Sequence, residues 1–405
     1  MTERSILHCD LNNFFASVEC HDHPEFNDRP IAVCGSVEDR HGIVLAKNER
    51  AKSFGVKTAE PVWQAKSKCT DLLIVPPHFD RYEYFSKAVS QIYLDYTNQV
   101  EAFGIDECWL DVTGSRRLFG SDMEIAGQIR ERVKSEQGLT VSVGVSFNKI
   151  FSKLASDMKK PDAITQITAE NYKQKVWPQP VGTLLGVGGA TAKRLHAMGI
   201  HTIGDLAQTD LGCLTASFGK AGQFLWTGAN GLDTSEVMQN ETGIPPKSIG
   251  NSITCAQDLY EMGEIWPVLL YLSEKISNRM RMCGLLASGV QLMVKDNRLH
   301  TYQHQCRLAS PTRLTMELAD SAKKMFAQSY KWQCPVRALG ISGFALIPET
   351  AAQQASFFHN IIVDEKVELL ESRVEELRGK YGNSAVKRAV FMENQPFFGS
   401  TSGKK

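Results

Sequence analysis

The chain has 405 residues, of which 42% are hydrophobic and 22% are charged, and its formal net charge at pH 7 is zero. This composition is typical of a soluble globular protein with more than one core, and the length suggests about three domains. The ten cysteines are scattered and include no CxxC pair, which argues against a disulfide framework or a structural zinc site. No apolar leader follows Met1 and no stretch approaches the ~18 apolar residues of a membrane span, so we expect a protein of the reducing cytosol.

The first 165 residues alternate between predicted strands and predicted helices. We expect strands at 5–11, 30–35, 42–48, 72–77 and 139–146, and a strand pair within 100–112. We expect helices at 12–20, 81–97, 123–138 and 149–161. Strands mixed with two long helices are typical of an α/β domain of the split βαβ kind.

The rest of the chain divides into a helical segment, a linker, a segment of mixed strands and helices, and a tail. Residues 166–235 are expected to be helical, with short turns marked by glycine, and 236–247 has no apolar periodicity and contains Pro245 and Pro246, so we interpret it as a linker. Between 248 and 347, alternating runs predict strands that are interleaved with helices at 260–283 and 311–330. Residues 348–405 form a tail.

Two acids occupy an otherwise apolar strand pattern in "FGIDECWLDV". Asp106 and Glu107 lie among Ile105, Trp109 and Leu110, and such a pair is more often found on a half-exposed edge than in a site. A third acid, Asp10, ends the apolar run "SILHCDL". Three carboxylates on adjacent strands suit hard divalent cations, and two such ions clamp the attacking and leaving oxygens of a phosphoryl displacement. The sequence therefore predicts that Mg²⁺ neutralises these acids.

Several motifs resemble those of Y-family DNA polymerases of the polymerase IV type. They are "CDLNNFFASVE", "FGIDECWLDVTG", "SVGVSFNKIFSKLASDMKKPDAI", "LLGVGGATAKRLHAMGIHTIGDLA" and "PPKSIGNSIT", and in this order they span roughly residues 5 to 347. The resemblance implies an α/β fold with an α+β palm of the split βαβ type. It implies a palm with small fingers (1–165, fingers about 21–77), a helical thumb with a helix-hairpin-helix (166–235), and a C-terminal α/β little finger (248–347).

The resemblance also assigns roles to the three acids. Asp10 and Asp106 would ligate two Mg²⁺ ions, assisted by the backbone carbonyl of Leu11. Glu107 would complete the metal site at the primer 3′ end and act as the catalytic glutamate. The implied activity is addition of dNTPs to a primer 3′ end on a DNA template, at low fidelity, in translesion synthesis.

Other residues match the family's nucleotide pocket. Phe15 is at the position of the steric gate, whose ring would collide with a ribose 2′-hydroxyl. Phe14 borders the same pocket, and we expect it to pack in the core. Lys160 matches a lysine that contacts the triphosphate.

The segment "ERAK" departs from the family's "YEAR", which is another triphosphate contact. Glu49 stands in place of the tyrosine and Lys52 in place of the arginine. Lysine still meets a phosphate as a point charge, but it lacks the bidentate fork of arginine. Arg50 is an alternative contact, and the departure puts nucleotide affinity or fidelity in doubt.

Contacts with DNA are expected in two parts of the chain. A Gly-rich turn is usually only a turn, but "LLGVGG" followed by "MGIHTIGDLA" resembles a helix-hairpin-helix that binds phosphate through backbone amides. Between 247 and 346, twelve Lys and Arg stand against seven Asp and Glu, giving +5, although scattered charge is usually a solvated surface. The residues expected to contact DNA are Gly186, Gly188, Gly189, Lys193, Lys149 and Lys153.

Two features of the tail stand out. "QASFF" resembles the peptide by which bacterial polymerases dock on the sliding clamp, with Gln354, Phe357 and Phe358 as the contact residues. Apolar residues then recur with helical spacing from Val363 to Tyr381, which predicts an amphipathic helix that packs on its own protein.

Two rival functions use the same acids. A nucleotide cyclase also sets two metals on paired acids, but it needs neither the hairpin at 186–189 nor a basic last domain. A non-catalytic DNA-binding accessory is disfavoured because all three acids are present. We expect a monomer that acts on primer-template DNA and dNTP in the cytoplasm, in association with the nucleoid.

Overall fold

A computed structural model describes residues 4–36, 40, 42–239, 246–351 and 361–393. The chain divides into two compact units, one formed by residues 1–35 and 43–243 and the other by residues 36–42 and 244–405. Among the described residues, no helix is both long enough and apolar enough to cross a membrane.

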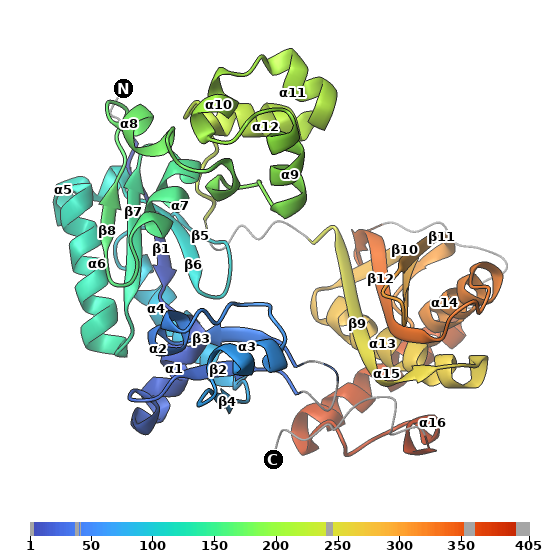
Figure 1. The fold of residues 1–405 in the computed structure, drawn as a ribbon. Coiled ribbons are helices and arrows are strands. Elements are labelled where there is room, and N and C mark those ends of the chain that lie inside the picture. Colours follow the sequence, from blue (N-terminus) through green and yellow to red (C-terminus); the bar gives the residue numbers. More distant parts are fainter. Residues whose placement is uncertain (1–3, 37–39, 41, 240–245, 352–360, 394–405) are drawn as a thin grey trace. The chain divides into compact units, whose positions relative to one another are not determined.

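A five-stranded sheet in the order β5-β6-β1-β7-β8 is the centre of the first unit (Figure 1). Its strands are β1 (Ile6–Leu11), β5 (Val100–Ala102), β6 (Glu107–Asp111), β7 (Val141–Ser146) and β8 (Ile164–Gln166). β1 pairs antiparallel with both β6 and β7, while β7 and β8 run parallel. The register places Asp10 opposite Glu107 on one side and opposite Ser142 on the other.

The two faces of this sheet carry different helices. Leu7, Cys9 and Leu11 point to one face and share a core with α4 and α6, because alternate strand residues point the same way. His8 and Asp10 point to the other face, where they contact α7. The helices that surround this sheet are α1 (Phe14–Asp22), α4 (Phe79–Leu94), α5 (Arg116–Phe119), α6 (Asp122–Gln137) and α7 (Lys149–Met158).

Two smaller assemblies complete the first unit. A three-stranded sheet, β3-β2-β4, has its own small core with two short helices. Its elements are β2 (Ile31–Cys34), β3 (Val44–Lys47), β4 (Leu73–Val75), α2 (Glu49–Ser53) and α3 (Val62–Lys68). A helical segment follows β8 and consists of α8 (Tyr172–Val176), α9 (Gly189–Ala197), α10 (Ile203–Gln208), α11 (Leu211–Phe218) and α12 (Lys220–Ala229).

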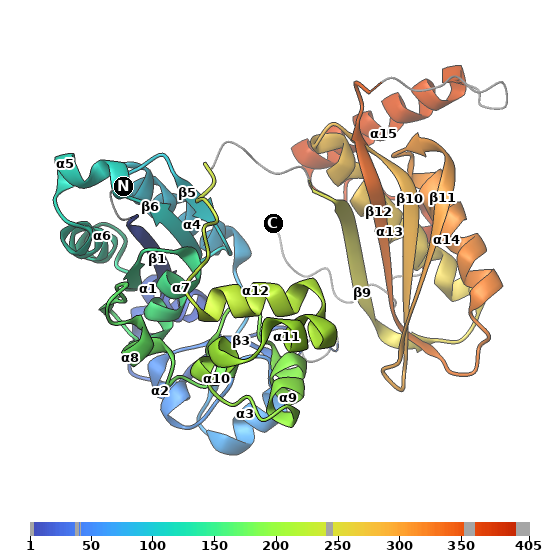
Figure 2. The ribbon, with the colours of Figure 1, turned by 90° about the horizontal axis from the view of Figure 1, so that it is seen from above.

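The second unit is a four-stranded antiparallel sheet in the order β11-β10-β12-β9, with α13 and α14 on one face (Figure 2). Its long strands pair along most of their length, as between Leu285 and Pro348 at one end of β10 and β12. The elements are β9 (Ser248–Leu259), β10 (Leu285–Asp296), β11 (Thr301–Thr312), β12 (Val336–Pro348), α13 (Met262–Met282) and α14 (Thr315–Ser329).

The tail helix α15 (Ile361–Tyr381) docks on this second unit through charged side chains, and the short α16 (Ala389–Glu393) follows it. Glu371 is 8% exposed and accepts hydrogen bonds from Arg281 (2.7 Å) and the backbone N–H of Thr315. The expected packing of the apolar stripe is wrong at Leu370 and Tyr381, each 63% exposed. The helix therefore turns a polar face inward, because its partners include the partly buried arginines Arg281 and Arg313.

Most expected elements of the first unit and both helices of the second are present in the structure. One element differs at an important place: β6 begins at Glu107, and the chain bends between Phe103 and Asp106. Asp106 therefore lies in the turn that leads into the strand, and its backbone carbonyl accepts a hydrogen bond from the N–H of Leu11 at 3.0 Å. The short strand β8 and the helices α2 and α3 were not expected.

Gly144 sets the distance between the sheet and α7. A Cβ at this position would lie 1.9 Å from the carbonyl oxygen of Ser152 and 2.4 Å from the backbone nitrogen of Ser156. Both atoms belong to the helix backbone, so no side-chain rotation can make room. α7 consequently lies closer to β7 than any residue with a side chain would allow.

We expect Gly144→Ala to destabilise the first unit by about 3 kcal/mol or more, because the helix must move away from the sheet. The matched control is Gly127→Ala within α6, where an added Cβ meets nothing within 4 Å. That substitution should stabilise the protein by about 0.5–1 kcal/mol through helix propensity. Denaturant unfolding measures both changes, and a wild-type midpoint for Gly144→Ala would contradict the close contact.

Candidate active site

Asp10 and Glu107 form a cross-strand pair on the α7 face of the central sheet. Asp10, at the end of β1, is 5% exposed, and Glu107, at the start of β6, is its direct partner in the register. Directly paired residues lie about 4.5–5.5 Å apart at Cβ, and like charges in that position repel. This pair is therefore stable only with positive charge beside it.

Two lysines supply that charge. Lys153 of α7 places its Nζ 2.9 Å from Glu107 Oε2 and 3.2 Å from Asp10 Oδ2. Lys160, just beyond α7, places its Nζ 2.7 Å from the same Asp10 oxygen. Both ammonium groups also contact Asp157, so two cations and three carboxylates form one cluster. Lys153 was expected on DNA and Lys160 on the triphosphate, and here both ammonium groups lie against the acids.

Among the described residues, Asp106 is the one of the three acids that forms no ion pair with a lysine. Burial, and then the neighbouring charges of Asp10 and Glu107, raise the pKa of Asp106 to about 6. The pKa of Glu107 moves the other way, because hydrogen bonds with His8 and Lys153 outweigh its burial and lower it to about 2. A further cation beside Asp106 would relieve the repulsion that raises its pKa.

His8 lies behind the acids, fully buried on β1. Its Nδ1 is 2.8 Å from the Ser156 hydroxyl, and its Nε2 is 3.4 Å from Glu107 Oε2. Burial lowers the pKa of this imidazole. The ring of Trp109 meets it edge-on, with the centroids 5.2 Å apart. The Glu107 carboxylate is thus bordered by an imidazole on one side and an ammonium group on the other.

The donor chemistry fits divalent cations. Asp10, Asp106 and Glu107 offer carboxylate oxygens, and the backbone carbonyl of Leu11 is adjacent in sequence, which is the ligand type that Mg²⁺ prefers. Within the described ranges, no three His, Cys, Asp or Glu side chains converge closely enough to form a finished metal site. The lysine ammonium groups draw Asp10 and Glu107 toward themselves, which accounts for this arrangement.

Phe14 and Phe15 follow the acids in the chain and face different surroundings. Phe14 is 3% exposed and packs in the core of the central sheet, as expected. Phe15 is half-buried, and its ring stacks on that of Tyr82 at 4.1 Å between centroids and 10° between planes. Phe15 therefore presents part of its ring to the surface at the start of α1.

The "ERAK" segment forms α2, and its charges pair among themselves. Glu49 accepts a hydrogen bond from the side-chain amide of Asn13 at 2.9 Å and lies 3.3 Å from Lys52 Nζ. Partial burial opposes ionisation of Glu49, but these two neighbours prevail and lower its pKa. Arg50 turns to Asp28 at 3.1 Å. Lys52 is therefore beside the loop that precedes Phe15, while Arg50 pairs elsewhere.

The glycine turn at 186–189 opens α9. Gly186 has φ +91°, a conformation that favours glycine, and Gly188 is the N-cap of the helix. A Cβ at Gly188 or Gly189 would meet nothing within 4 Å, and both residues are exposed, so the turn itself lies open at the surface. Lys193 is exposed on the same helix. Lys149, by contrast, is paired with Glu101 at 2.6 Å.

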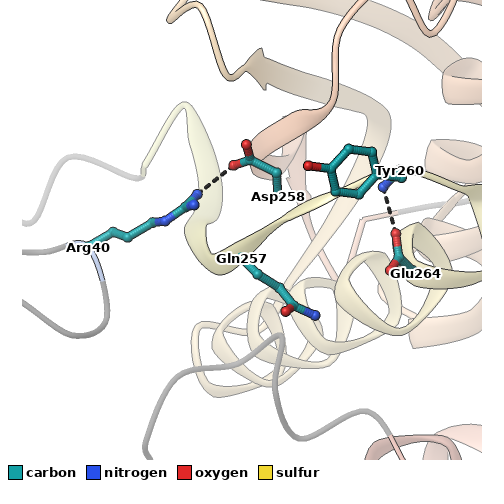
Figure 3. Close-up of a pocket in the computed structure, with 5 residues that line it drawn as sticks. All are labelled: Arg40, Gln257, Asp258, Tyr260 and Glu264. Atoms are coloured by element: carbon teal, nitrogen blue, oxygen red, sulfur yellow. Dashed lines mark hydrogen bonds and ion pairs between the residues drawn. The ribbon is translucent and has the colours of Figure 1, made fainter.

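A pocket of about 340 Å³ lies in the second unit and contains none of the expected site residues. Figure 3 shows its lining, with Arg40 beside Asp258 at 2.5 Å and the backbone N–H of Tyr260 donating to Glu264. Its polar, open lining brings no reactive pair together, so we do not place the reaction there. Gln354, Phe357 and Phe358 of the "QASFF" segment lie outside the described residues.

The sequence did not predict the residues that contact and orient the expected site residues. His8 stood in the quoted run "SILHCDL", and strand alternation already placed it on the same face as Asp10. Tyr82 and Glu19 gave no local signal, because their contact with each other spans 63 positions. The role of Lys153 as counter-charge could be inferred only from the approach of α7 to β1.

Three family models match the chain. The impB/mucB/samB family matches residues 9–157, its C-terminal domain matches residues 246–356, and the thumb domain of DNA polymerase iota matches residues 182–233. A protein named DNA polymerase IV from Acetivibrio thermocellus is 48% identical over 97% of this chain and 98% of its own length. DNA polymerase IV 1 of Bacillus subtilis is 35% identical over 97% of this chain and 94% of its own length.

A solved Y-family DNA polymerase chimera has a similar fold. Its TM-score with this chain is 0.76 at 22% sequence identity, and the match covers 85% of this chain and 99% of the chimera. This likeness confirms the expected fold class, an α/β chain with a helical thumb segment.

The raised pKa of Asp106 predicts a pH-dependent effect of Asp106→Asn on metal-free protein. Because the folded state disfavours the carboxylate, the penalty is absent below the ordinary pKa of 3.8 and complete above about pH 6. In EDTA, the variant should therefore raise the melting temperature more at pH 7.5 than at pH 4.5, by about 2–4 °C. The exposed Asp71, substituted by Asn, is the control, and an equal shift at both pH values would contradict the expectation.

Proposed function

Since this chain belongs to the Y family of DNA polymerases, we propose that Asp10, Asp106 and Glu107 form its catalytic centre. The chain is a DNA-directed DNA polymerase that adds dNTPs to a primer 3′ end and synthesises across damaged template. Its family requires a divalent metal. The cyclase-like and non-catalytic alternatives are not favoured, because the curated relatives are named as polymerases.

The observation that carries the site is the cross-strand acid pair with its lysines. Asp10 and Glu107 face each other in register, Asp106 precedes the strand, and Lys153 and Lys160 lie within 3.2 Å of Asp10. A purely structural cluster would pair all three acids, whereas Asp106 is left with a pKa of about 6. This imbalance supports a site that awaits more positive charge.

We assign two Mg²⁺ ions to these acids and to the Leu11 carbonyl. When bound, the ions supply charge neutralisation to the triphosphate and Lewis acidity to the primer 3′ oxygen. Asp10 and Asp106 hold the nucleotide end of the centre, and Glu107 holds the primer end. Lys160 exchanges its contact with Asp10 for one with the triphosphate, since a flexible ammonium group can bind either anion.

The proposed nucleotide pocket lies at the start of α1. Phe15 acts as the sugar gate, with its exposed part against the 2′ position. Lys52 binds the triphosphate as a point charge. Glu49 weakens this attraction, because its carboxylate already pairs with Lys52 at 3.3 Å. The DNA backbone binds at the amides of Gly188 and Gly189 with Lys193 nearby, and the enzyme acts as a monomer at the nucleoid.

Asp106→Ala should abolish primer extension, because a metal ligand is lost, while leaving primer-template affinity nearly unchanged. Extension with labelled primer and a fluorescence titration of the duplex measure the two properties. The exposed acid Asp71, substituted by Ala, is the control and should extend normally. Near-normal extension by Asp106→Ala would falsify the metal assignment.

The tail segment "QASFF" is proposed to dock on the sliding clamp. Replacing Phe357 and Phe358 by Ala removes two apolar anchors, each worth about 1.5–3 kcal/mol when fully buried at a partner. Even a loss of about 1.4 kcal/mol is tenfold in affinity, so stimulation by loaded clamp should fall several-fold while extension on a bare primer stays unchanged.

The opposing outcome is also defined. If both phenylalanines pack within the protein, the double variant will lose melting temperature and bare-primer activity together, with no clamp-specific defect. Recording the melting temperature beside both extension assays separates these cases. An equal loss of activity with and without clamp rules out the docking role.

A further inference from the structure

The ring of Phe15 is held by neighbours on another helix. α1 begins at Phe14, after Asn13 with φ 49°, and the Asn13 side chain binds Glu49 instead of capping the helix. The side of the Phe15 ring that faces inward lies flat on Tyr82. Phe79, 52% exposed at the start of α4, meets both rings edge-on at 5.9 Å and 5.7 Å. The three rings form a cluster with Tyr82 as its base.

Tyr82 is itself fixed from behind. It is fully buried, and its hydroxyl donates a short hydrogen bond to Oε1 of Glu19 on α1. Glu19 is 2% exposed, and its two carboxylate oxygens lie 3.0 Å and 3.1 Å from His78 Nδ1. Burial and the Glu19 carboxylate raise the pKa of the Tyr82 phenol above its ordinary value, so the hydroxyl remains a donor.

This arrangement exceeds what core packing requires. A buried carboxylate is costly unless its charge is met by hydrogen bonds, and an apolar pair at positions 19 and 82 would fill the same space without that cost. What the hydrogen bond adds is a fixed direction for the Tyr82 ring. Because the two rings are nearly parallel, the same bond fixes the plane of Phe15.

We propose that Tyr82, anchored through its hydroxyl to Glu19, is a positioning residue for sugar selection, holding Phe15 in the orientation that excludes a 2′-hydroxyl. The proposal rests on the role of Phe15 as the gate. Tyr82 does not touch the nucleotide; it acts through the ring in front of it. Loss of the anchor should let the Phe15 ring turn, which admits a ribose and leaves a deoxyribose little affected.

The test compares the ratio of ribonucleotide to deoxyribonucleotide incorporation efficiency on a primer-template with Mg²⁺. Tyr82→Phe keeps the ring and removes the hydrogen bond, while Tyr82→Met fills similar space without a flat face. We expect the ratio to rise about two- to tenfold, less for Phe than for Met, as loss of an aromatic contact implies. The matched control is Tyr93→Phe, which removes another buried hydroxyl from α4 away from Phe15 and should leave the ratio unchanged.

Phe15→Ala separates this inference from the gate assignment. If Phe15→Ala leaves the ratio unchanged, Phe15 is not the gate, and the proposed function is wrong at that point. If Phe15→Ala raises the ratio and both Tyr82 variants leave it unchanged, the gate stands and the positioning role fails. Where Tyr82→Met does not fold, Tyr82→Phe alone decides.

A double variant tests the route of the effect. In a Phe15→Ala background, Tyr82→Met should raise the ratio no further, because there is no ring left to position. A further increase would mean that Tyr82 acts on the sugar by another route and would overturn the proposal. If Tyr82 has only a structural role, its variants should lower the melting temperature and slow the incorporation of both kinds of nucleotide equally. The incorporation ratio would then stay at its wild-type value, and that result would also contradict the positioning proposal.

Discussion

The repulsion between Asp10 and Glu107 across β1 and β6 is the constraint on which the first unit depends. Two carboxylates in direct register need cations, and α7 provides one with Lys153 while Lys160 follows just behind. The helix must therefore lie against the polar face of the sheet, with its own backbone close to β7. The same neighbours leave Asp106 short of positive charge and with a raised pKa, which supports the proposed assignment of these acids to a cation site.

In the six residues of β1, alternate side chains face either the apolar core or the charged cluster beside α7. Leu7, Cys9 and Leu11 enter the apolar core, and the residues between them face α7. The core side can thus be packed tightly without altering the charged side, since the strand backbone isolates one from the other. At its end the strand passes directly to Phe14 and Phe15, which repeat the division, one ring in the core and one half-exposed.

Much of this could be predicted from local patterns, and the failures share a cause. The strands and helices of the first unit follow apolar periodicity, and Phe14 packs as expected. Asp106 was expected in mid-strand because Ile105 extends the apolar run, yet the chain turns there. On α15 the apolar stripe suggested the wrong inner face, because the arginines that bind Glu371 come from distant segments. Apolar periodicity predicts which side chains are buried against apolar surface. It does not predict ion pairs between segments that are distant in the sequence.

Gly144 has a consequence for how the proposed catalytic centre could adapt to its substrates. Because the carbonyl of Ser152 would lie 1.9 Å from a Cβ there, the backbones of α7 and β7 pack in direct contact. This close packing sets the distance from the α7 backbone to the acids, and the long side chains of the two lysines are the flexible part of the cluster. In the proposed role of the cluster, adaptation to each new base pair would then come from the flexible side chains of Lys153 and Lys160 and not from movement of the helix backbone.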